Sequence, residues 1–522
     1  MTTTQVYKAV WGTDRLDERQ ADVQLAGGGI AVDLLAAILA RGGLRVTVVP
    51  GDGSDPVGVN TVPYTAELLY LLADRFRVPE IADLAMYGRL PASLQASSGT
   101  KKSLGFVYHR PNSAHDQREN VQFSVPDEHA EWHAYLPAVR KHTRSIAERY
   151  GAQYLGAAEA TDRPARLVLN CSGSGPGVNA TAYFEGIRRF EDLRPPKDGG
   201  YTQPWSEGST AHVFRAGWVH IASFDNHPEA QTRGAVLTLR LSARHPDAGG
   251  ELDEVLARLG RRYPDLGLLL AGATRTGRWT GSLGKPGVSA DALRLPGEAT
   301  LALDLQHGEA LFGQNLTMAL ELVHAAAATL LRPGALAGTA AIDDTVRTIG
   351  EFQRKLLCDN EWFAEAGLLA TTDFCTWNAF VRAWLLWSIS AALALKKVRI
   401  DAARSRDWRP ASKFADGVDW FDLAPGIADT VVGAAQVMRQ LHLPGMIAPV
   451  VAQRVFRLLS RRRIIPPLYQ FGRPEARRYR LNLPTRLKLL AWTFTLAPKA
   501  YRGMLTADNI TAVPDQEAEL KR

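Results

Sequence analysis

Apolar positions in residues 21–50 change their spacing twice, and the changes predict a strand–helix–strand unit. A short apolar run leads into three glycines, Gly27, Gly28 and Gly29. Leucine and isoleucine then recur at helical spacing up to Gly42, and residues 45–49 form a second, β-branched run. Such a unit is typical of a dinucleotide-binding fold, in which glycines let a pyrophosphate approach the N-terminus of the helix.

Three positions of this unit depart from the pattern of a dinucleotide site. Val32 replaces the third glycine of Gly-x-Gly-x-x-Gly, and Asp33 follows it in the first helical turn. The second strand ends in Pro50, which cannot accept a hydrogen bond from a ribose as Asp or Glu would. We expect Val32 to disturb helix–strand packing and the carboxylate of Asp33 to repel a phosphate. The sequence therefore predicts the scaffold of a nucleotide site in which some functional groups are replaced.

The remaining periodicity predicts an α/β protein with an inserted, strand-rich region and a helical C-terminal part. The expected domains are 1–110, the first part of the nucleotide-binding domain; 111–295, a strand returning to the nucleotide site plus a substrate-binding insertion; 296–345, the last part of the nucleotide-binding domain; and 346–522, a helical, basic region. Helices are expected over 64–75, 132–150, 250–262 and 310–331, and strands over 104–108, 165–171, 211–224, 233–242 and 299–305.

The net charge of +7 is concentrated near the C-terminus. Between Arg454 and Arg502 the chain is rich in Arg and Lys, and Glu475 is the lone acid. Such a segment forms either a solvated face that pairs with acids elsewhere or a docking surface for an acidic partner. No nucleic-acid fold signature accompanies the charge.

Several other functions are disfavoured by the composition. The three cysteines (Cys171, Cys358 and Cys375) lack the spacing of metal ligands, and His220 and His227 lack a third ligand. The N-terminus has no apolar signal region, and the longest apolar stretch, 383–395, is too short to cross a bilayer. We expect a cytoplasmic protein that binds neither metal, membrane nor nucleic acid.

Four segments in order carry a family resemblance: DRFRVPEIADLA at 74–85, GTKKSLGFVYHR at 99–110, GWVHIASFDNHP at 217–228 and TWNAFVRAW at 376–384. The chain resembles the reduced-flavin-dependent halogenases of the tryptophan-halogenase-like superfamily. It is most similar to the branch that chlorinates tetracyclines, other aromatic polyketides and phenols. The resemblance implies a glutathione-reductase-like, Rossmann-type FAD-binding domain with an inserted β-rich substrate domain.

The resemblance also implies a chemistry and a set of site residues. In the family, reduced FAD and oxygen convert chloride into hypochlorous acid, which travels through a tunnel to a lysine beside the substrate. That lysine lies five residues before a strand phenylalanine, which here gives Lys101, with Lys102 as the second choice. The implied cofactor-binding residues are Gly27, Gly29 and Gly173, and the implied tunnel residues are Trp218, His220 and Phe224.

Departures from the family motifs gather on the footprint of the flavin. The family's Trp-x-Trp-x-Ile-Pro motif reads WVHIAS from Trp218, and its Asp-Pro pair reads Glu309-Ala310. Together with Val32, Asp33 and Pro50, these positions indicate a degenerate FAD site.

Three functions follow as alternatives. The first is a non-catalytic partner subunit of an active halogenase or another tailoring enzyme in a natural-product pathway, docked through the basic C-terminal region. The second is an active halogenase that chlorinates an aromatic or phenolic substrate through the lysine, and the third is a flavin monooxygenase. The cofactor is FAD if the protein is active, supplied in reduced form by a separate flavin reductase, and otherwise none.

Overall fold

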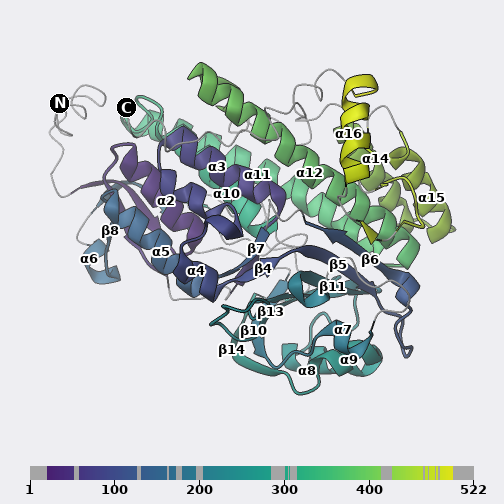
Figure 1. The fold of residues 1–522 in the computed structure, drawn as a ribbon. Helices are drawn as coiled ribbons and strands as arrows, with labels where there is room; N and C mark the ends of the chain where they lie inside the picture. Colours follow the sequence, from purple (N-terminus) through teal and green to yellow (C-terminus); the bar gives the residue numbers. More distant parts are fainter. Residues whose placement is uncertain are drawn as a thin grey trace.

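The computed structural model describes residues 20–51, 58–125, 131–161, 164–171, 179–195, 204–281, 283, 300–303, 305, 314–412, 426–461, 465–467, 470–476, 478–479 and 483–497. Within these ranges two large sheets and one small sheet are held together by long helices (Figure 1).

The first sheet is parallel and has the order β15-β9-β1-β2-β8. Its first unit matches the prediction from periodicity, because β1 (Ala21–Ala26), α2 (Ile30–Arg41) and β2 (Val46–Val49) follow one another. Strand β9 (Ala165–Asn170) pairs with β1, as expected of a strand that returns to the nucleotide site. Strands β8 (Gln153–Tyr154) and β15 (Thr300–Ala302) form the two edges. The parallel pairing confirms the predicted α/β class.

The second sheet is mixed and has the order β14-β10-β13-β12-β11-β5-β6-β16. Its strands are β5 (Ser103–Tyr108), β6 (Asn120–Ser124), β10 (Asn179–Glu185), β11 (Ser209–Phe214), β12 (Gly217–Ser223), β13 (Ala235–Leu241), β14 (Thr274–Gly281) and β16 (Arg478–Tyr479). Helices α7 (Phe190–Leu193), α8 (Leu252–Arg262) and α9 (Pro264–Leu270) cover one face, and the long C-terminal helices lie on the other side (Figure 1). A third, small antiparallel sheet has the order β3-β7-β4, from β3 (Gly58–Asn60), β4 (Gly99–Lys101) and β7 (Glu131–Tyr135).

The remaining helices pack around these sheets. They are α3 (Pro63–Phe76), α4 (Ala92–Ser97), α5 (Leu136–Arg149), α6 (Ala157–Thr161), α10 (Gln314–Leu330), α11 (Thr339–Ala370), α12 (Phe374–Ser405), α13 (Arg409–Ser412), α14 (Ile427–Arg439), α15 (Ala448–Leu459) and α16 (Leu483–Thr495). Short 3-10 turns occur at Pro79–Leu84, Tyr87–Arg89, Gln117–Glu119, Trp205–Glu207 and Gln440–His442. The helical C-terminal region is therefore as predicted.

Two expected elements were wrong. The helix expected from residue 132 starts four residues later, because Glu131–Tyr135 is strand β7. The single strand expected over 211–224 is a hairpin of β11 and β12. Its turn contains Ala216 at φ 68, and the backbone N–H of Ala216 donates to the hydroxyl of Thr371 at 2.9 Å. Alanine rarely adopts this left-handed backbone conformation, which Gly or Asn would have signalled in the sequence. A tertiary contact stabilises it here, and sequence patterns do not reveal such contacts.

Helix α12 is the central core helix of the C-terminal region. It is long and apolar enough to cross a membrane by length and composition, but 89% of its most apolar 18-residue window is buried inside the fold. The apolar stretch 383–395 is continued on both sides by further residues of α12, so the helix is longer than the stretch that the sequence pattern marks. Arg382, which is fully buried, donates to the carbonyl oxygens of Gln470, Phe471 and Ala476, so the segment after α15 is anchored on α12.

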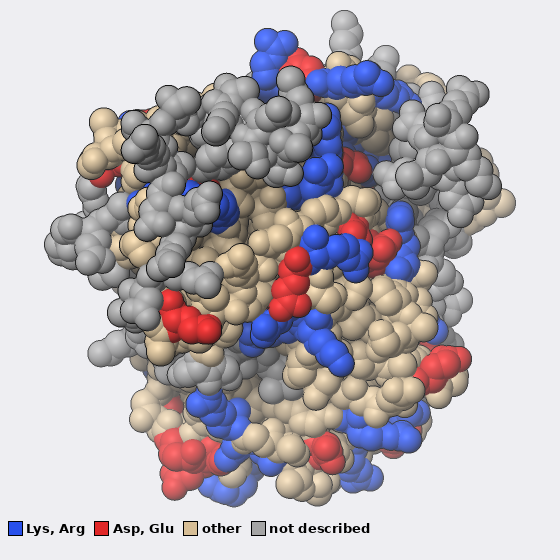
Figure 2. Space-filling view, turned by 90° about the vertical axis from the view of Figure 1, so that its left-hand side faces the viewer, with Lys and Arg blue, Asp and Glu red and all other residues tan. Residues whose placement is uncertain are grey.

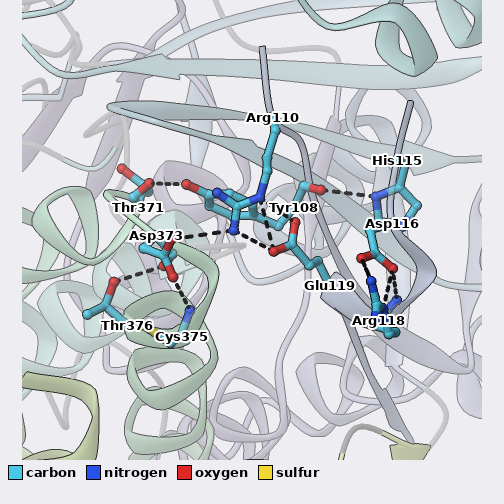
Figure 3. A network of polar contacts seen from close by, with 10 residues as sticks. All are labelled: Tyr108, Arg110, His115, Asp116, Arg118, Glu119, Thr371, Asp373, Cys375 and Thr376. Carbon is cyan, nitrogen blue, oxygen red and sulfur yellow. Dashed lines mark hydrogen bonds and ion pairs between the residues drawn. The ribbon is translucent and has the colours of Figure 1, made fainter. Parts of the chain in front are cut away.

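A polar network fixes the turn before α12 to the mixed sheet (Figure 3). The Tyr108 hydroxyl donates to the carbonyl of Thr371 at 2.9 Å, and the carboxylate of Asp373 accepts from the backbone N–H of Cys375 at 3.0 Å. Arg110 forms ion pairs with Glu119 and, at 3.4 Å, with Asp373. These contacts fix the start of α12 to the end of β5.

The described residues show neither a single-sign charged face in the view of Figure 2 nor a metal site. On the face shown in Figure 2, Lys and Arg alternate with Asp and Glu. Among the described residues no group of three or more His, Cys, Asp or Glu side chains could hold a metal ion. The ring of His227 is bonded to the carbonyl of Ser98 at 2.8 Å, which gives it a structural role.

Candidate functional site

The glycine turn between β1 and α2 has the backbone geometry that a pyrophosphate requires. Gly27 and Gly29 have φ angles of 140° and 114°, which favour glycine. The N–H of Gly27 donates to the carbonyl of Val49 at 2.8 Å, so the turn rests on the end of β2. Gly29 is the N-cap of α2 and has no side chain of its own to occupy the helix N-terminus. The residues present therefore fit the phosphate part of a dinucleotide.

Asp33 makes contacts that the sequence could not indicate. The hydroxyls of Thr143 on α5 and Tyr154 on β8 donate to its two carboxylate oxygens, at 2.8 and 2.7 Å. Burial raises the pKa of Asp33 to about 6, and the two hydroxyl donors oppose this shift. The carboxylate is engaged in the interface of α2 with α5 and β8, and the expected repulsion of a phosphate by Asp33 stays a prediction.

The other departures in the nucleotide unit have different surroundings. Val32 is fully buried in the main core, and Pro50 is exposed at the end of β2. Gly173, Glu309 and Ala310 lie outside the described residues. The structure therefore describes the turn for the pyrophosphate and leaves the expected contacts to the flavin ring undescribed.

The two candidate lysines have opposite environments. Lys101 is buried on β4, where its ammonium donates to the carbonyl of Thr61 at 2.5 Å and pairs with the carboxylate of Glu131. The side chain of Lys102 is 40% exposed and pairs with Glu207 at 2.9 Å. Of the two, Lys101 is the interior lysine.

Lys101 belongs to a polar face of the small sheet. Register places Lys101 opposite Glu131 and places His133 between Asn60 and Gly99. Because directly paired residues share a face and side chains alternate along a strand, Glu131, His133 and Lys101 lie on one face. The other face of β7 carries Trp132 and Ala134, which are in the apolar core.

Strand β12 and the residue after it pack against this polar face. The N–H at Nδ1 of His133 donates to the carbonyl of Ser223 at 2.9 Å, and the amide of Asn60 donates to the hydroxyl of Ser209 on β11 at 3.5 Å. Phe224 contacts Tyr135 with ring centroids 5.4 Å apart and stacks on Tyr183 at 6.1 Å. The site is thus a polar layer between two sheets, bordered by aromatic rings.

The expected tunnel residues divide into two groups. His220 lies in the polar layer, where the charge of Lys101 and the ring of His133 act on it electrostatically, and Phe224 forms the aromatic border. Trp218 packs against Trp377 of α12, with ring centroids 5.9 Å apart. The structure therefore brings Lys101, His220 and Phe224 together and places Trp218 in the contact with α12.

Close backbone approach allows the layer to form. A Cβ at Gly99 would lie 2.0 Å from the carbonyl oxygen of Ser223, so β4 reaches the end of β12 only because residue 99 is glycine. The amide of Asn226 then binds both the N–H and the carbonyl of Thr100, at 2.9 and 2.7 Å. The segment after β12 is thereby joined to β4 by side-chain hydrogen bonds.

Burial dominates the electrostatics of the layer. It lowers the pKa of His133 and of His220 to about 3, with the nearby Lys101 charge acting in the same direction. Both rings are therefore neutral at pH 7. Burial raises the pKa of Glu131, and the ammonium of Lys101 opposes that shift. A buried ion pair beside neutral imidazoles offers one positive donor and several acceptors to a ligand.

Sequence reasoning missed Glu131 and His133. The alternation of Glu131 and His133 with Trp132 and Ala134 is a strand signal, but it is short and directly precedes an amphipathic helix. Strand β7 pairs with β3 and β4, which lie far before it in the chain, and hydrophobic periodicity carries no information about such distant pairing.

Searches by sequence found no matching protein-family model but two curated relatives. Monodechloroaminopyrrolnitrin halogenase PrnC of Pseudomonas fluorescens is 25% identical, in an alignment that covers 92% of this chain and 93% of that protein. Tetracycline 7-halogenase of Kitasatospora aureofaciens is also 25% identical, over 72% of this chain and 74% of that protein.

Solved structures share the fold. The crystal structure of halogenase PltM matches with a TM-score of 0.77 and 20% identity, covering 88% of this chain and 99% of that one. PltM in complex with phloroglucinol and FAD matches with a TM-score of 0.75 and 19% identity over the same shares. The expected fold, an FAD-binding α/β domain with a mixed sheet and helical C-terminal region, is confirmed by this similarity. The near full-length similarity to two halogenases and the shared fold show that the chain resembles the flavin-dependent halogenases.

Proposed function

We propose that this chain is an active flavin-dependent halogenase that halogenates an aromatic, hydroxyl-bearing intermediate of a natural-product pathway. The observation that carries the proposal is the position of Lys101. It is the buried one of the two candidate lysines, and it lies in a polar layer with Glu131, His133 and His220. The engagement of Asp33 by Thr143 and Tyr154 supports a bound pyrophosphate, because the carboxylate is held in the interface of α2 with α5 and β8.

The chain's own residues have distinct tasks in this proposal. FAD, when bound at the glycine turn and reduced by a separate reductase, would activate dioxygen, the oxidant that turns halide into hypohalous acid. Glu131 and the carbonyl of Thr61 orient the ammonium of Lys101, which would donate a hydrogen bond to the oxygen of that acid. Phe224, Tyr135 and Tyr183 supply an aromatic border for a planar substrate.

The proposal is tested by product analysis. The purified chain would be incubated in air with FAD, a flavin reductase and NADH, chloride or bromide, and phloroglucinol, the compound in the PltM complex. A halogenated product that requires the chain, the reductase and the halide is expected. A hydroxylated product instead would indicate a monooxygenase, and no product with any of a panel of phenols would contradict the proposal.

A non-catalytic partner role is the second candidate, and two observations favour it. Pro50 at the end of β2 has no side-chain acceptor for a ribose. Helix α16 exposes an apolar stripe at helical spacing, made of Leu483, Leu487, Leu490 and Phe494, and Lys488 of the same helix is exposed as well. An exposed apolar stripe next to a positive charge suits an acidic protein partner.

Two measurements separate this candidate from the active enzyme. A titration with oxidised and reduced FAD would give no binding for a non-catalytic subunit, whereas the active enzyme binds the cofactor. The double substitution Leu487→Ser, Leu490→Ser would abolish association with a co-purified tailoring enzyme, while Leu268→Ser, at an exposed leucine of α9, serves as the matched control.

A further inference from the structure

One nitrogen of the polar layer is a buried acceptor aimed at no described group. His133 is fully buried, and its Nδ1 N–H is committed to the carbonyl of Ser223 at 2.9 Å. Because the ring is neutral, its Nε2 carries a lone pair and no proton. Among the described residues, Nε2 of His133 has no hydrogen-bond partner. Buried polar atoms are almost always satisfied, by protein, water or ligand.

The surroundings restrict what can satisfy this nitrogen. On the same sheet face the neighbours are Asn60 on β3 and the Lys101–Glu131 pair, and residue 99 opposite His133 is a glycine with no side chain. Two of the three N–H groups of the Lys101 ammonium are engaged by Thr61 and Glu131, and among the described contacts none reaches Nε2 of His133. The acceptor thus needs a donor from outside the described chain, and a neutral hydroxyl suits it because a further cation beside Lys101 would be repelled.

We propose that Nε2 of His133 accepts a hydrogen bond from a hydroxyl group of the aromatic substrate and so determines the preference for hydroxylated rings. The inference rests on the proposed function only in taking an aromatic compound as the ligand of this layer. Ser223 acts as the positioning group, because its carbonyl fixes which ring nitrogen bears the proton. Lys101 lies on the adjacent strand, so the hydroxyl contact would orient the ring toward the lysine.

Binding without turnover tests the assignment. The probes are phloroglucinol and 1,3,5-trimethoxybenzene, in which every hydroxyl is methylated, titrated into the full chain by calorimetry. We expect His133→Phe to weaken the binding of phloroglucinol about tenfold, equivalent to ~1.4 kcal/mol. The affinity for the trimethoxy compound should not change. The control His227→Phe, which removes a ring bonded to Ser98 outside the layer, should leave the ratio of the two affinities unchanged. Equal weakening of both probes in His133→Phe, or no change in either, would overturn the proposal.

A second measurement on the unsubstituted protein covers the case in which His133→Phe does not fold. In nitrogen-15 spectra of histidine-labelled protein, the Nε2 resonance of His133 should shift on adding phloroglucinol or other phenols and stay in place with their methyl ethers. If no phenol of the panel moves this resonance, a water molecule or nothing occupies the acceptor and the inference fails. If phenols bind in a way that depends on His133 but no halogenated product forms, the inference stands and the proposed function is contradicted.

Discussion

At the scale of single residues, some carboxyl groups are buried against hydroxyl partners, and the sequence could not indicate which. Glu321 on α10 is buried and accepts the hydroxyl of Tyr64 on α3 at 2.8 Å. Burial raises the pKa of Glu321 to about 8, with the Tyr64 hydrogen bond opposing the shift. At neutral pH this side chain is therefore mostly a neutral carboxylic acid that joins two helices beside the parallel sheet.

This raised pKa makes stability depend on pH. Between pH 4.5, the ordinary pKa of this carboxyl group, and about pH 8, Glu321 is protonated in the folded protein and ionised in the unfolded chain. The free energy of unfolding therefore falls as pH rises through that window, by about 1.4 kcal/mol per pH unit from this group. Glu321→Gln, which stays neutral, should flatten this decline in urea unfolding between pH 5 and 8. Glu229→Gln, at a side chain 79% exposed, is the control, and parallel slopes for Glu321→Gln and wild type would contradict the assignment.

Asp33 gives a second prediction at this scale. Because its carboxylate is held by Thr143 and Tyr154, Asp33→Asn should change the affinity for FAD by less than about twofold. The same substitution should lower the free energy of unfolding by about 1–2 kcal/mol, since one hydroxyl loses its acceptor. Calorimetric titration with FAD checks the first value. A tenfold gain in affinity would mean that the carboxylate does repel the phosphates.

At the scale of elements, the sequence predicted what local periodicity encodes. The unit β1–α2–β2 and the helices α3 and α8 follow from apolar spacing and terminal glycines or prolines. The hairpin β11–β12 could not be predicted, because its turn residue Ala216 adopts a positive φ through a contact with Thr371, more than a hundred residues away. Strand β7 was missed because its five residues run directly into α5.

The junction of β4 with β12 yields a prediction about an element contact. A Cβ at residue 99 would meet the backbone of Ser223 at 2.0 Å, and backbone atoms cannot yield as a side chain can. Gly99→Ala should therefore destabilise the fold by about 3 kcal/mol and abolish halogenation, because Lys101 and His133 are positioned by this junction.

Gly88→Ala is the matched control for this substitution. No atom lies within 4 Å of a Cβ built at Gly88, so its stability should stay within about 0.5 kcal/mol of wild type. Urea unfolding measures both variants. A Gly99→Ala protein as stable and active as wild type would show that β4 does not need this close approach.

At the scale of the whole molecule, the polar layer is assembled from segments far apart in the chain. Lys101 on β4, Glu131 and His133 on β7, and His220 on β12 meet only through the packing of the small sheet against the mixed sheet. Family resemblance indicated Lys101, His220 and Phe224, since these positions follow motif order. Glu131 and His133 lie in no motif, so only the three-dimensional pairing reveals them.

The central claim is that the interior lysine at 101 carries the chemistry and its neighbour does not. The most direct measurement is the rate of halogenated-product formation by the Lys101→Ala and Lys102→Ala variants, at equal folded content and with FAD binding measured in each. Lys101→Ala should lose activity by about a hundredfold to a thousandfold while keeping FAD affinity, because hypohalous acid would lose its hydrogen-bond donor beside the substrate. Lys102→Ala, which breaks only a half-exposed pair with Glu207, should retain activity within about twofold. Undiminished halogenation by a folded Lys101→Ala protein would contradict the account.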